Sequence, residues 1–163
     1  MPGLQLIMVK LDQTIVIGIG NIFRGDDAVG LVAARRLREM HLPGVQVLEL
    51  DGDITTLAES WQGASKVIVV DAAASQGVAG TIFRFAAHAE PLPRKLFATC
   101  CSCHAFGLAH QIELARTLKQ LPPCLIVYGI EGKDFTLGSK LSPQVAEAVP
   151  EVIRRVLEEI TPA

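Results

Sequence analysis

The sequence has no run of Lys or Arg, and its formal net charge is only −2 at pH 7. A nucleic-acid-binding surface needs concentrated positive charge, so no nucleic-acid partner is expected. No apolar stretch reaches the roughly 20 residues that a helix needs to cross a bilayer, so no membrane partner is expected either. Residues 1–12 contain no basic segment ahead of their apolar part and no small-residue cleavage site. We therefore predict no signal peptide and a cytoplasmic protein with reduced thiols.

Low-complexity linkers and internal repeats are also missing from the 163 residues. Hydrophobic residues make up 50% and charged residues 20%, a balance typical of a globular chain rather than a disordered one. We expect a single domain over residues 1–163 that is monomeric, because nothing in the sequence demands an interface. Two interpretations of residues 1–12 stay open, namely a flexible leader or a segment ahead of a natural start at Met8.

Apolar runs and amphipathic segments alternate along the chain. This alternation predicts an α/β fold with a five-stranded, mixed, mostly parallel sheet that is covered on both faces. The link between residues 72 and 81 is short, so the fourth strand is expected to run antiparallel. The predicted strands are residues 14–18, 45–50, 66–72, 81–85 and 124–129, and the predicted helices are residues 27–40, 55–61, 106–118 and 144–160.

A glycine-rich turn joins the first strand to the first helix, over residues 18–30 (GIGNIFRGDDAVG). Such turns usually bind phosphate at the bare helix N-terminus, but here Asp26 and Asp27 stand where the anion would go. A dinucleotide fingerprint fits poorly, because Phe23 replaces the third glycine. Asp51 also lies about thirty residues beyond Gly20, against roughly twenty for the ribose-binding acid. The two acids favour a cation instead.

Further polar residues are expected at the same sheet edge, because ligands of parallel sheets bind beyond the carboxyl ends of the strands. Asp51 closes the second strand, Asp71 ends the third, and His104 precedes the third helix. Each acid also has a purely structural interpretation: Asp26 as the helix N-cap, Asp27 as a first-turn acid, and Asp71 as an acceptor for loop amides. The convergence of Asp27, Asp71 and His104 indicates a divalent-cation site for a metal such as zinc or nickel.

Three cysteines, Cys100, Cys101 and Cys103, precede His104. The spacing matches both a haem-attachment pattern and a redox C-x-x-C. Haem attachment would need an exported setting, and a redox pair usually follows a strand and opens a helix. A structural zinc site would need a second ligand pair, whereas Cys124 stands alone in a strand. We interpret the thiols as incidental neighbours of a functional histidine, and their role stays open.

Three motifs together resemble the nickel–iron hydrogenase maturation endopeptidases. They are residues 18–30, residues 69–72 (VVDA) and residues 102–108 (SCHAFGL). Residues 128–132 (YGIEG) and 141–143 (LSP), followed by a terminal helix, are similar to that family too. The resemblance covers the chain from about Thr14 onward.

The resemblance implies a three-layer α/β/α sandwich and an aspartyl-type endopeptidase. It implies removal of a C-terminal extension from the hydrogenase large-subunit precursor after nickel insertion. Asp27, Asp71 and His104 would be the catalytic, metal-binding residues, and Gly18, Gly20, Asn21, Asp26 and Asp51 would form the supporting loop. Where some members of the family carry Glu, this chain has the shorter Asp27, so Asp26 also stays open as the ligand. The nickel would come with the substrate, and none would be tightly bound in the resting enzyme.

A function of another class is also compatible with these residues. A non-enzymatic nickel-binding or metal-delivery module would use the same three ligands and add the thiols of Cys100, Cys101 and Cys103. The chain has no G-x-S-x-G elbow that would decide for a serine hydrolase. The group that attacks the peptide bond, the hydrogenase served and its cleavage sequence do not follow from the residues.

Overall fold

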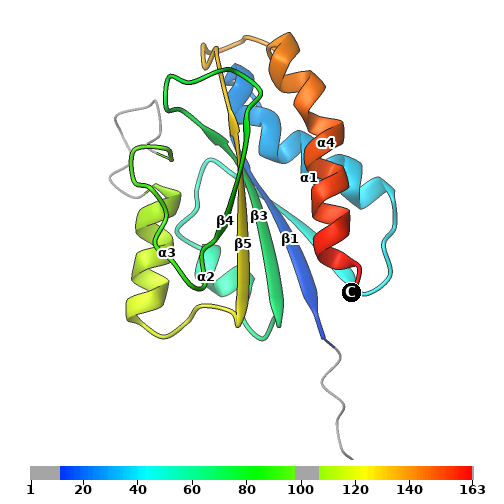
Figure 1. The fold of residues 1–163 in the computed structure, drawn as a ribbon, viewed down its shortest axis with the longest axis vertical. Coiled ribbons are helices and arrows are strands. Elements are labelled where there is room, and N and C mark those ends of the chain that lie inside the picture. Colours follow the sequence, from blue (N-terminus) through cyan, green and yellow to red (C-terminus); the bar gives the residue numbers. More distant parts are fainter. Residues whose placement is uncertain (1–11, 98–106, 163) are drawn as a thin grey trace, which may run out of the picture.

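The computed structural model describes residues 12–97 and 107–162. Strands and helices alternate through these residues, and each predicted element is present (Figure 1). In chain order the elements are β1 (Thr14–Gly20), the 3₁₀ turn η1 (Gly25–Ala28), α1 (Val29–Glu39), β2 (Val45–Asp51), α2 (Leu57–Ser60), β3 (Lys66–Ala73), β4 (Ile82–Ala86), α3 (Leu108–Thr117), β5 (Cys124–Glu131) and α4 (Pro143–Ile160).

The five strands form one sheet in the order β2-β1-β3-β5-β4. The four strands β2, β1, β3 and β5 are parallel, and β4 pairs with β5 in the antiparallel direction. The mixed, mostly parallel sheet is therefore confirmed, together with the reversed fourth strand. The carboxyl ends of the four parallel strands meet at one edge, which is at the top of Figure 1.

Helices cover both faces of the sheet. Figure 1 shows α1 and α4 on one face and α2 and α3 on the other, which gives three layers. Each face has its own apolar core. Val145, Val149, Val152 and Val156 of α4 are fully buried on one face, and Trp61 is buried on the other, where its indole N–H donates to the Gln120 carbonyl at 2.9 Å.

Two glycines allow the first strand and the first helix to pack in close contact. A Cβ atom at Gly18 would lie 2.2 Å from the Gly30 carbonyl oxygen and 2.6 Å from the Ala34 Cβ. A Cβ atom at Gly30 would lie 2.3 Å from the carbonyl oxygens of Ile19 and Val70. No side chain fits in either place. The glycines thus set the position at which α1, and the acids ahead of it, sit above the end of the sheet.

The first and second helices differ from their predicted bounds. The first was expected to begin at Asp27, but Asp27 lies in η1 and the α-helix begins at Val29. Gly25 has a φ of +54°, so the chain turns sharply just before the acids. Met40, the last residue of the predicted helix, lies just beyond the end of α1 and is 47% exposed. The second helix is reduced to a single turn, α2.

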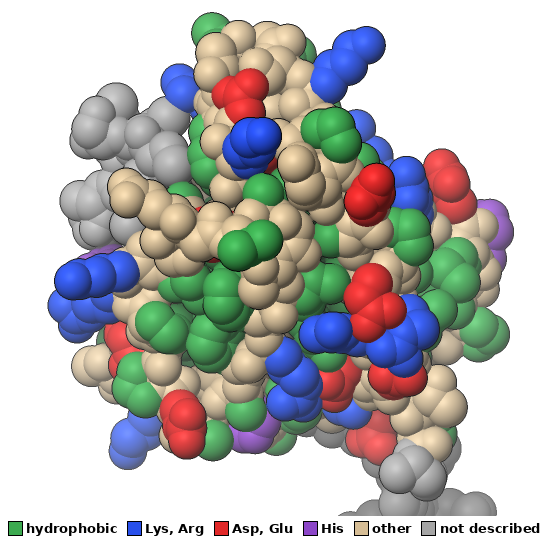
Figure 2. Space-filling model, turned by 45° about the horizontal axis from the view of Figure 1, so that its top comes forward, with side chains coloured by type: hydrophobic (Ala, Val, Ile, Leu, Met, Phe, Trp, Pro, Cys, Tyr) green, Lys and Arg blue, Asp and Glu red, His purple; other side chains and the backbone are tan. Residues whose placement is uncertain are grey.

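The surface carries charge of both signs. Figure 2 shows acidic and basic side chains intermixed on the right-hand side of the view. On α4 they pair with each other, as Arg154 does with Glu151 at 2.8 Å. None of the helices in residues 12–97 and 107–162 has the length and apolar character needed to cross a membrane.

The close packing of β1 on α1 generates a prediction. Gly18→Ala should destabilise the protein by about 3 kcal/mol, because the new methyl group meets rigid backbone rather than a movable side chain. Gly44→Ala is the control, since its Cβ would have nothing within 4 Å and only the positive φ of +72° opposes it, at a cost of about 1–2 kcal/mol. Urea unfolding of both variants measures the difference, and equal losses would contradict the role given to Gly18.

Candidate active site

Three predicted acids meet at the carboxyl edge of the sheet. Asp51 is the last residue of β2 and pairs in register with Gly20, the last residue of β1. Asp71 lies near the end of β3, and Asp27 lies in η1, directly after the turn that follows β1. The parallel registers bring these segments side by side. Of the predicted set, Asp27 and Asp71 lie near enough for the charge of Asp27 to raise the pKa of Asp71, whereas His104 lies outside the described residues.

Asp27 is partly buried. Desolvation raises the pKa of its carboxyl above the ordinary value, and the negative charge of Asp51 raises it further. A hydrogen bond from the Asn21 backbone N–H and the positive charge of Arg24 act in the opposite direction, lowering this pKa. The net effect is a raised pKa, so the protein compensates the charge of the Asp27 carboxylate less fully than water would.

Asp71 is buried, with 9% of its surface exposed. Its pKa lies well above the ordinary value, first because burial penalises the charged form and second because Asp27 is negative. One oxygen accepts a hydrogen bond from the Ala72 backbone N–H at 2.8 Å, which lowers the pKa by less than the other effects raise it. The backbone bond that was considered as a structural role for Asp71 is thus real, but it does not offset the burial of the charge.

The electrostatics of this edge favour a positive ligand. The negative charge of Asp51 raises the pKa of Asp27, and that of Asp27 raises the pKa of Asp71, in both cases in addition to desolvation. Arg24 is the cationic side chain that acts on Asp27 in the opposite direction. Two carboxylates in such a place either share protons or bind a cation. An incoming divalent ion would remove the repulsion and replace the hydration that burial has taken away.

Asp26 has a different environment from its neighbour. It is fully buried, and both of its carboxylate oxygens accept hydrogen bonds from the segment between β5 and α4. The donors are Lys133 N at 2.7 Å, Asp134 N at 2.8 Å, Ser142 N at 2.6 Å and Ser142 Oγ at 2.7 Å. The interpretation of Asp26 as the N-cap of the first helix is wrong, because its oxygens bond to residues more than a hundred positions away.

The other residues of the predicted supporting loop shape the turn around Asp27. At Gly20 a Cβ atom would lie 1.9 Å from the Asp27 carbonyl oxygen, so the end of β1 touches the backbone of η1. The Asn21 side-chain oxygen accepts a bond from Phe23 N at 2.9 Å. Gly25 is similarly close to the Asp134 carbonyl, which also accepts a hydrogen bond from Asp26 N at 2.9 Å. The turn is therefore fixed on several sides.

Glu131 is a buried acid whose role was not predicted. It ends β5, and no part of its surface is exposed. Its oxygens accept bonds from Ser75 N at 2.8 Å, Ser75 Oγ at 2.8 Å and Gly77 N at 3.1 Å. Glu131 thus holds the loop that follows β3, just as Asp26 holds the loop that follows β5. Its place at the end of an apolar strand was the available signal, the same one that singled out Asp71.

An open hollow lies beside this edge. It is lined by Gln76, Gly77, Val78, Ala79, Gly132, Lys133 and Gln144. Neither Asp27 nor Asp71 lines it, so the acidic pair is not at the bottom of this hollow. The hollow instead separates the loop held by Glu131 from the loop held by Asp26.

The remaining predicted residues cannot be placed. His104, Cys100, Cys101 and Cys103 lie outside the described residues. Within residues 12–97 and 107–162, no group of three or more His, Cys, Asp or Glu side chains is arranged to hold a metal ion. The described part of the chain therefore supplies the two central carboxylates, with Asp51 near them, and not a complete three-ligand set.

Sequence comparisons place the chain among known proteins. The sequence model of the family described as hydrogenase maturation protease matches residues 32–159. A Methanocaldococcus jannaschii protein, provisionally named a hydrogenase maturation protease, is 31% identical over 93% of this chain and 99% of its own length. The Pyrococcus furiosus protein FrxA is 33% identical over 83% of this chain and 96% of its own length.

Solved structures share the fold. The hydrogenase maturating endopeptidase HybD from E. coli superposes with a TM-score of 0.72 at 23% identity, covering 91% of each chain. The solution structure of another endopeptidase from Escherichia coli gives 0.75 at 22% identity, covering 90% of each chain. These matches confirm the predicted three-layer sandwich, and the sequence matches decide for a protease over a metal-delivery module. The chain belongs to the hydrogenase maturation protease family.

Proposed function

We propose that this protein removes the C-terminal extension of a nickel–iron hydrogenase large-subunit precursor once nickel has been inserted. The observation that carries the proposal is the pair of desolvated, mutually repelling carboxylates of Asp27 and Asp71. In a maturation protease such a pair suits the recognition of a metal ion carried by the substrate. The family supplies the reaction class, and the acidic edge supports the choice of substrate.

The nickel ion would act as part of the substrate. Asp27 and Asp71, with His104 as the third expected ligand, form a set with too few donors to fill the coordination sphere of a metal. The remaining positions would be filled by ligands that the precursor already provides. Productive binding of the precursor at the acids then depends on the ion, so the enzyme checks that insertion is finished before it cleaves.

Asp27 rather than Asp26 is the ligand in this proposal. Asp26 is fully buried, and its two oxygens already accept four hydrogen bonds. Asp27 keeps part of its surface exposed, and desolvation raises its pKa despite the Asn21 hydrogen bond and the charge of Arg24. Binding through Asp26 would require the release of the β5–α4 connection, whereas binding through Asp27 requires no such change.

The ion would supply a Lewis acid beside the scissile bond, which polarises a carbonyl or makes a bound water more acidic. The residues of this chain orient the ion and exclude water from one side of it. Asp71 stands in the buried wall of the site, and its Ala72 hydrogen bond fixes the direction of the carboxylate. Asp51 adds negative charge at the exposed side.

The dependence on nickel can be tested with chelator-stripped enzyme. Nickel-loaded precursor should lose its C-terminal extension, and metal-free precursor should stay uncleaved, as followed by intact-protein mass spectrometry. The control adds zinc to the enzyme alone and supplies metal-free precursor, which should also stay intact. Equal cleavage of both precursors would refute recognition of the inserted metal.

Asp71→Asn should abolish cleavage and yet stabilise the free protein. The amide keeps the shape and the Ala72 bond, so we expect at least about a hundredfold loss of activity from the lost charge alone. At pH 7 the wild-type fold must either bury the charge of Asp71 or take up a proton, and the variant is free of both costs. The melting temperature of the variant should therefore be higher, by about 2–4 °C per kcal/mol.

The pH dependence fixes the sign of this stabilisation. Because the folded-state pKa of Asp71 is raised, wild-type stability falls as the pH rises from the ordinary value of 3.8 to the folded-state pKa, and it levels off above that. Below the ordinary value of 3.8 the side chain is neutral in both the folded and the unfolded chain, so the two melting temperatures should converge there. Calorimetry in the presence of chelator measures both curves. A variant less stable than the wild type at pH 7 would contradict the burial argument.

Asp26→Asn should have the opposite effect on stability. The amide nitrogen would face backbone N–H donors, and the loss of charge-assisted bonds should cost about 3 kcal/mol or more in the free energy of unfolding. Asp27→Asn is the matched control: it should unfold at no lower urea concentration than the wild type while losing cleavage. If Asp26→Asn is stable and inactive and Asp27→Asn is active, the ligand assignment is reversed.

A further inference from the structure

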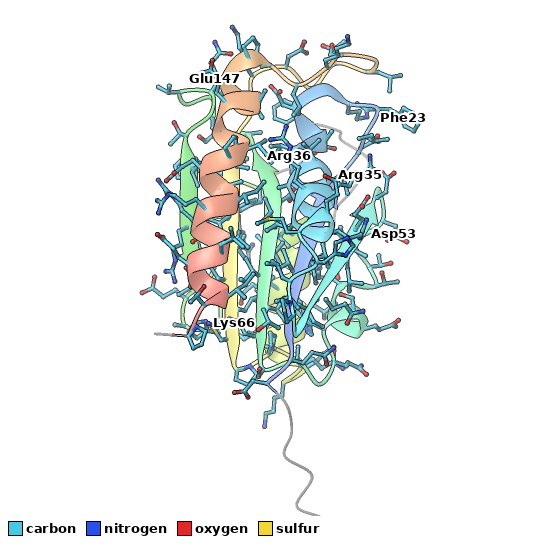
Figure 3. The ribbon with its side chains drawn as sticks, turned by 90° about the vertical axis from the view of Figure 1, so that its right-hand side faces the viewer. Phe23, Arg35, Arg36, Asp53, Lys66 and Glu147 are labelled. Carbon is cyan, nitrogen blue, oxygen red and sulfur yellow. The ribbon has the colours of Figure 1, made fainter. Side chains whose placement is uncertain are left out.

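Large hydrophobic side chains gather on the loops at the carboxyl edge of the sheet. Among the described residues six such side chains are exposed, and three of them, Phe23, Val78 and Leu137, belong to these loops. Phe23 is 69% exposed and Leu137 is 67% exposed. Figure 3 shows Phe23 on the outer side of the turn ahead of α1, away from the sheet. Exposed side chains of this size are typical of contact surfaces when they occur together.

Phe23 and Leu137 come from distant parts of the sequence but lie on adjoining backbone. The N–H of Gly138, the residue after Leu137, donates to the Phe23 carbonyl at 2.7 Å. We call these two residues the Phe23–Leu137 pair. The pair is the place where the β1–α1 turn and the β5–α4 connection both present an apolar side chain to solvent.

The pair is held in a fixed position. Asp26 ties the two loops together through Lys133, Asp134 and Ser142. The Asn21 side chain bonds to the backbone N–H of Phe23 itself. Neither loop has to be ordered when a partner binds, so the entropic cost of binding at this surface is small. Apolar side chains on a fixed backbone are suited to a docking surface.

The pair also borders the acidic edge. Phe23 is four residues ahead of Asp27, and Asn21 contacts both, through its side chain to Phe23 and through its backbone N–H to Asp27. A protein whose metal ion reaches Asp27 would therefore have its surface close to the turn that carries Phe23. The surface is continuous with the site at which the precursor would be cleaved, which sets the occupant apart from an unrelated partner.

We infer that the Phe23–Leu137 pair is a docking surface for the folded body of the hydrogenase large-subunit precursor. The precursor would present an apolar patch next to its metal and its C-terminal segment. This inference rests on the proposed function and adds a second recognition element, which is independent of nickel. Docking at the pair provides affinity for the folded precursor, and Asp27 and Asp71 detect whether nickel has been inserted.

The test compares Phe23→Ser/Leu137→Ser with a matched control, Met40→Ser/Leu118→Ser. Met40 and Leu118 are 47% and 55% exposed, and each follows the end of a helix that returns from the carboxyl edge. Affinity for metal-free precursor is measured by biolayer interferometry, because the proposed function leaves that precursor uncleaved. Steady-state cleavage of nickel-loaded precursor is measured alongside, and calorimetry verifies that both variants fold.

The docking variant should bind metal-free precursor at least about tenfold more weakly than the wild type, and the control variant should bind like the wild type. On nickel-loaded precursor the docking variant should show a raised KM with kcat retained. Equal affinity of the docking variant and the control would overturn the inference. The inference would also be overturned if sedimentation analysis showed a wild-type dimer that the docking substitutions dissociate, because a second copy of the chain would then occupy the surface. Binding by the pair without any cleavage by the wild type would instead refute the proposed function alone.

Discussion

The buried carboxylate of Asp26 is the contact on which the geometry of this edge depends. It accepts four hydrogen bonds from Lys133, Asp134 and Ser142 and joins the first turn of the chain to the connection ahead of the last helix. A buried charge is tolerated only when its oxygens are satisfied in this way. These bonds hold the β1–α1 turn against the β5–α4 connection. Separation of the two loops would leave the Asp26 charge and several N–H groups without partners.

Adjacent acids serve opposite purposes here. Asp26 is satisfied by the protein and holds the fold together, whereas Asp27, one residue later, is left with a raised pKa and few partners. The hydrogen bonds to Asp26 prevent Asp27 from moving away from Asp71, so their repulsion persists in the folded chain. A perturbed pair of this kind is typical of a functional site, where stability is given up for binding. Glu131 holds the neighbouring loop of residues 75–77 in the same way.

The same hydrogen bonds provide the fixed geometry that the proposed recognition of both a metal and a protein at one edge would require. Asp27 faces the acidic site, while Phe23, on the same turn, faces solvent. Because the turn is fixed at Gly20, Gly25 and Asp26, the distance between the apolar surface and the acids is fixed too. A partner that contacts both must match this spacing. Rigid spacing gives selectivity that a flexible loop would not provide.

The sequence by itself determined the order of strands and helices along the chain and the reversed fourth strand, because hydrophobic periodicity and link length are local signals. It also determined that Asp27 and Asp71 lie near each other, because the carboxyl ends of parallel strands share one edge of the sheet. Only the tertiary structure decided the roles of Asp26 and Glu131. Both bond to backbone N–H groups of other segments, which carry no side-chain signature in the sequence. The exposure of Phe23 was also undetermined, since an apolar residue in a turn has no period to show which way it points. The local sequence pattern determines the helices and strands. Long-range hydrogen bonds determine that Asp26 is structural and leave Asp27 available for the proposed metal ligation.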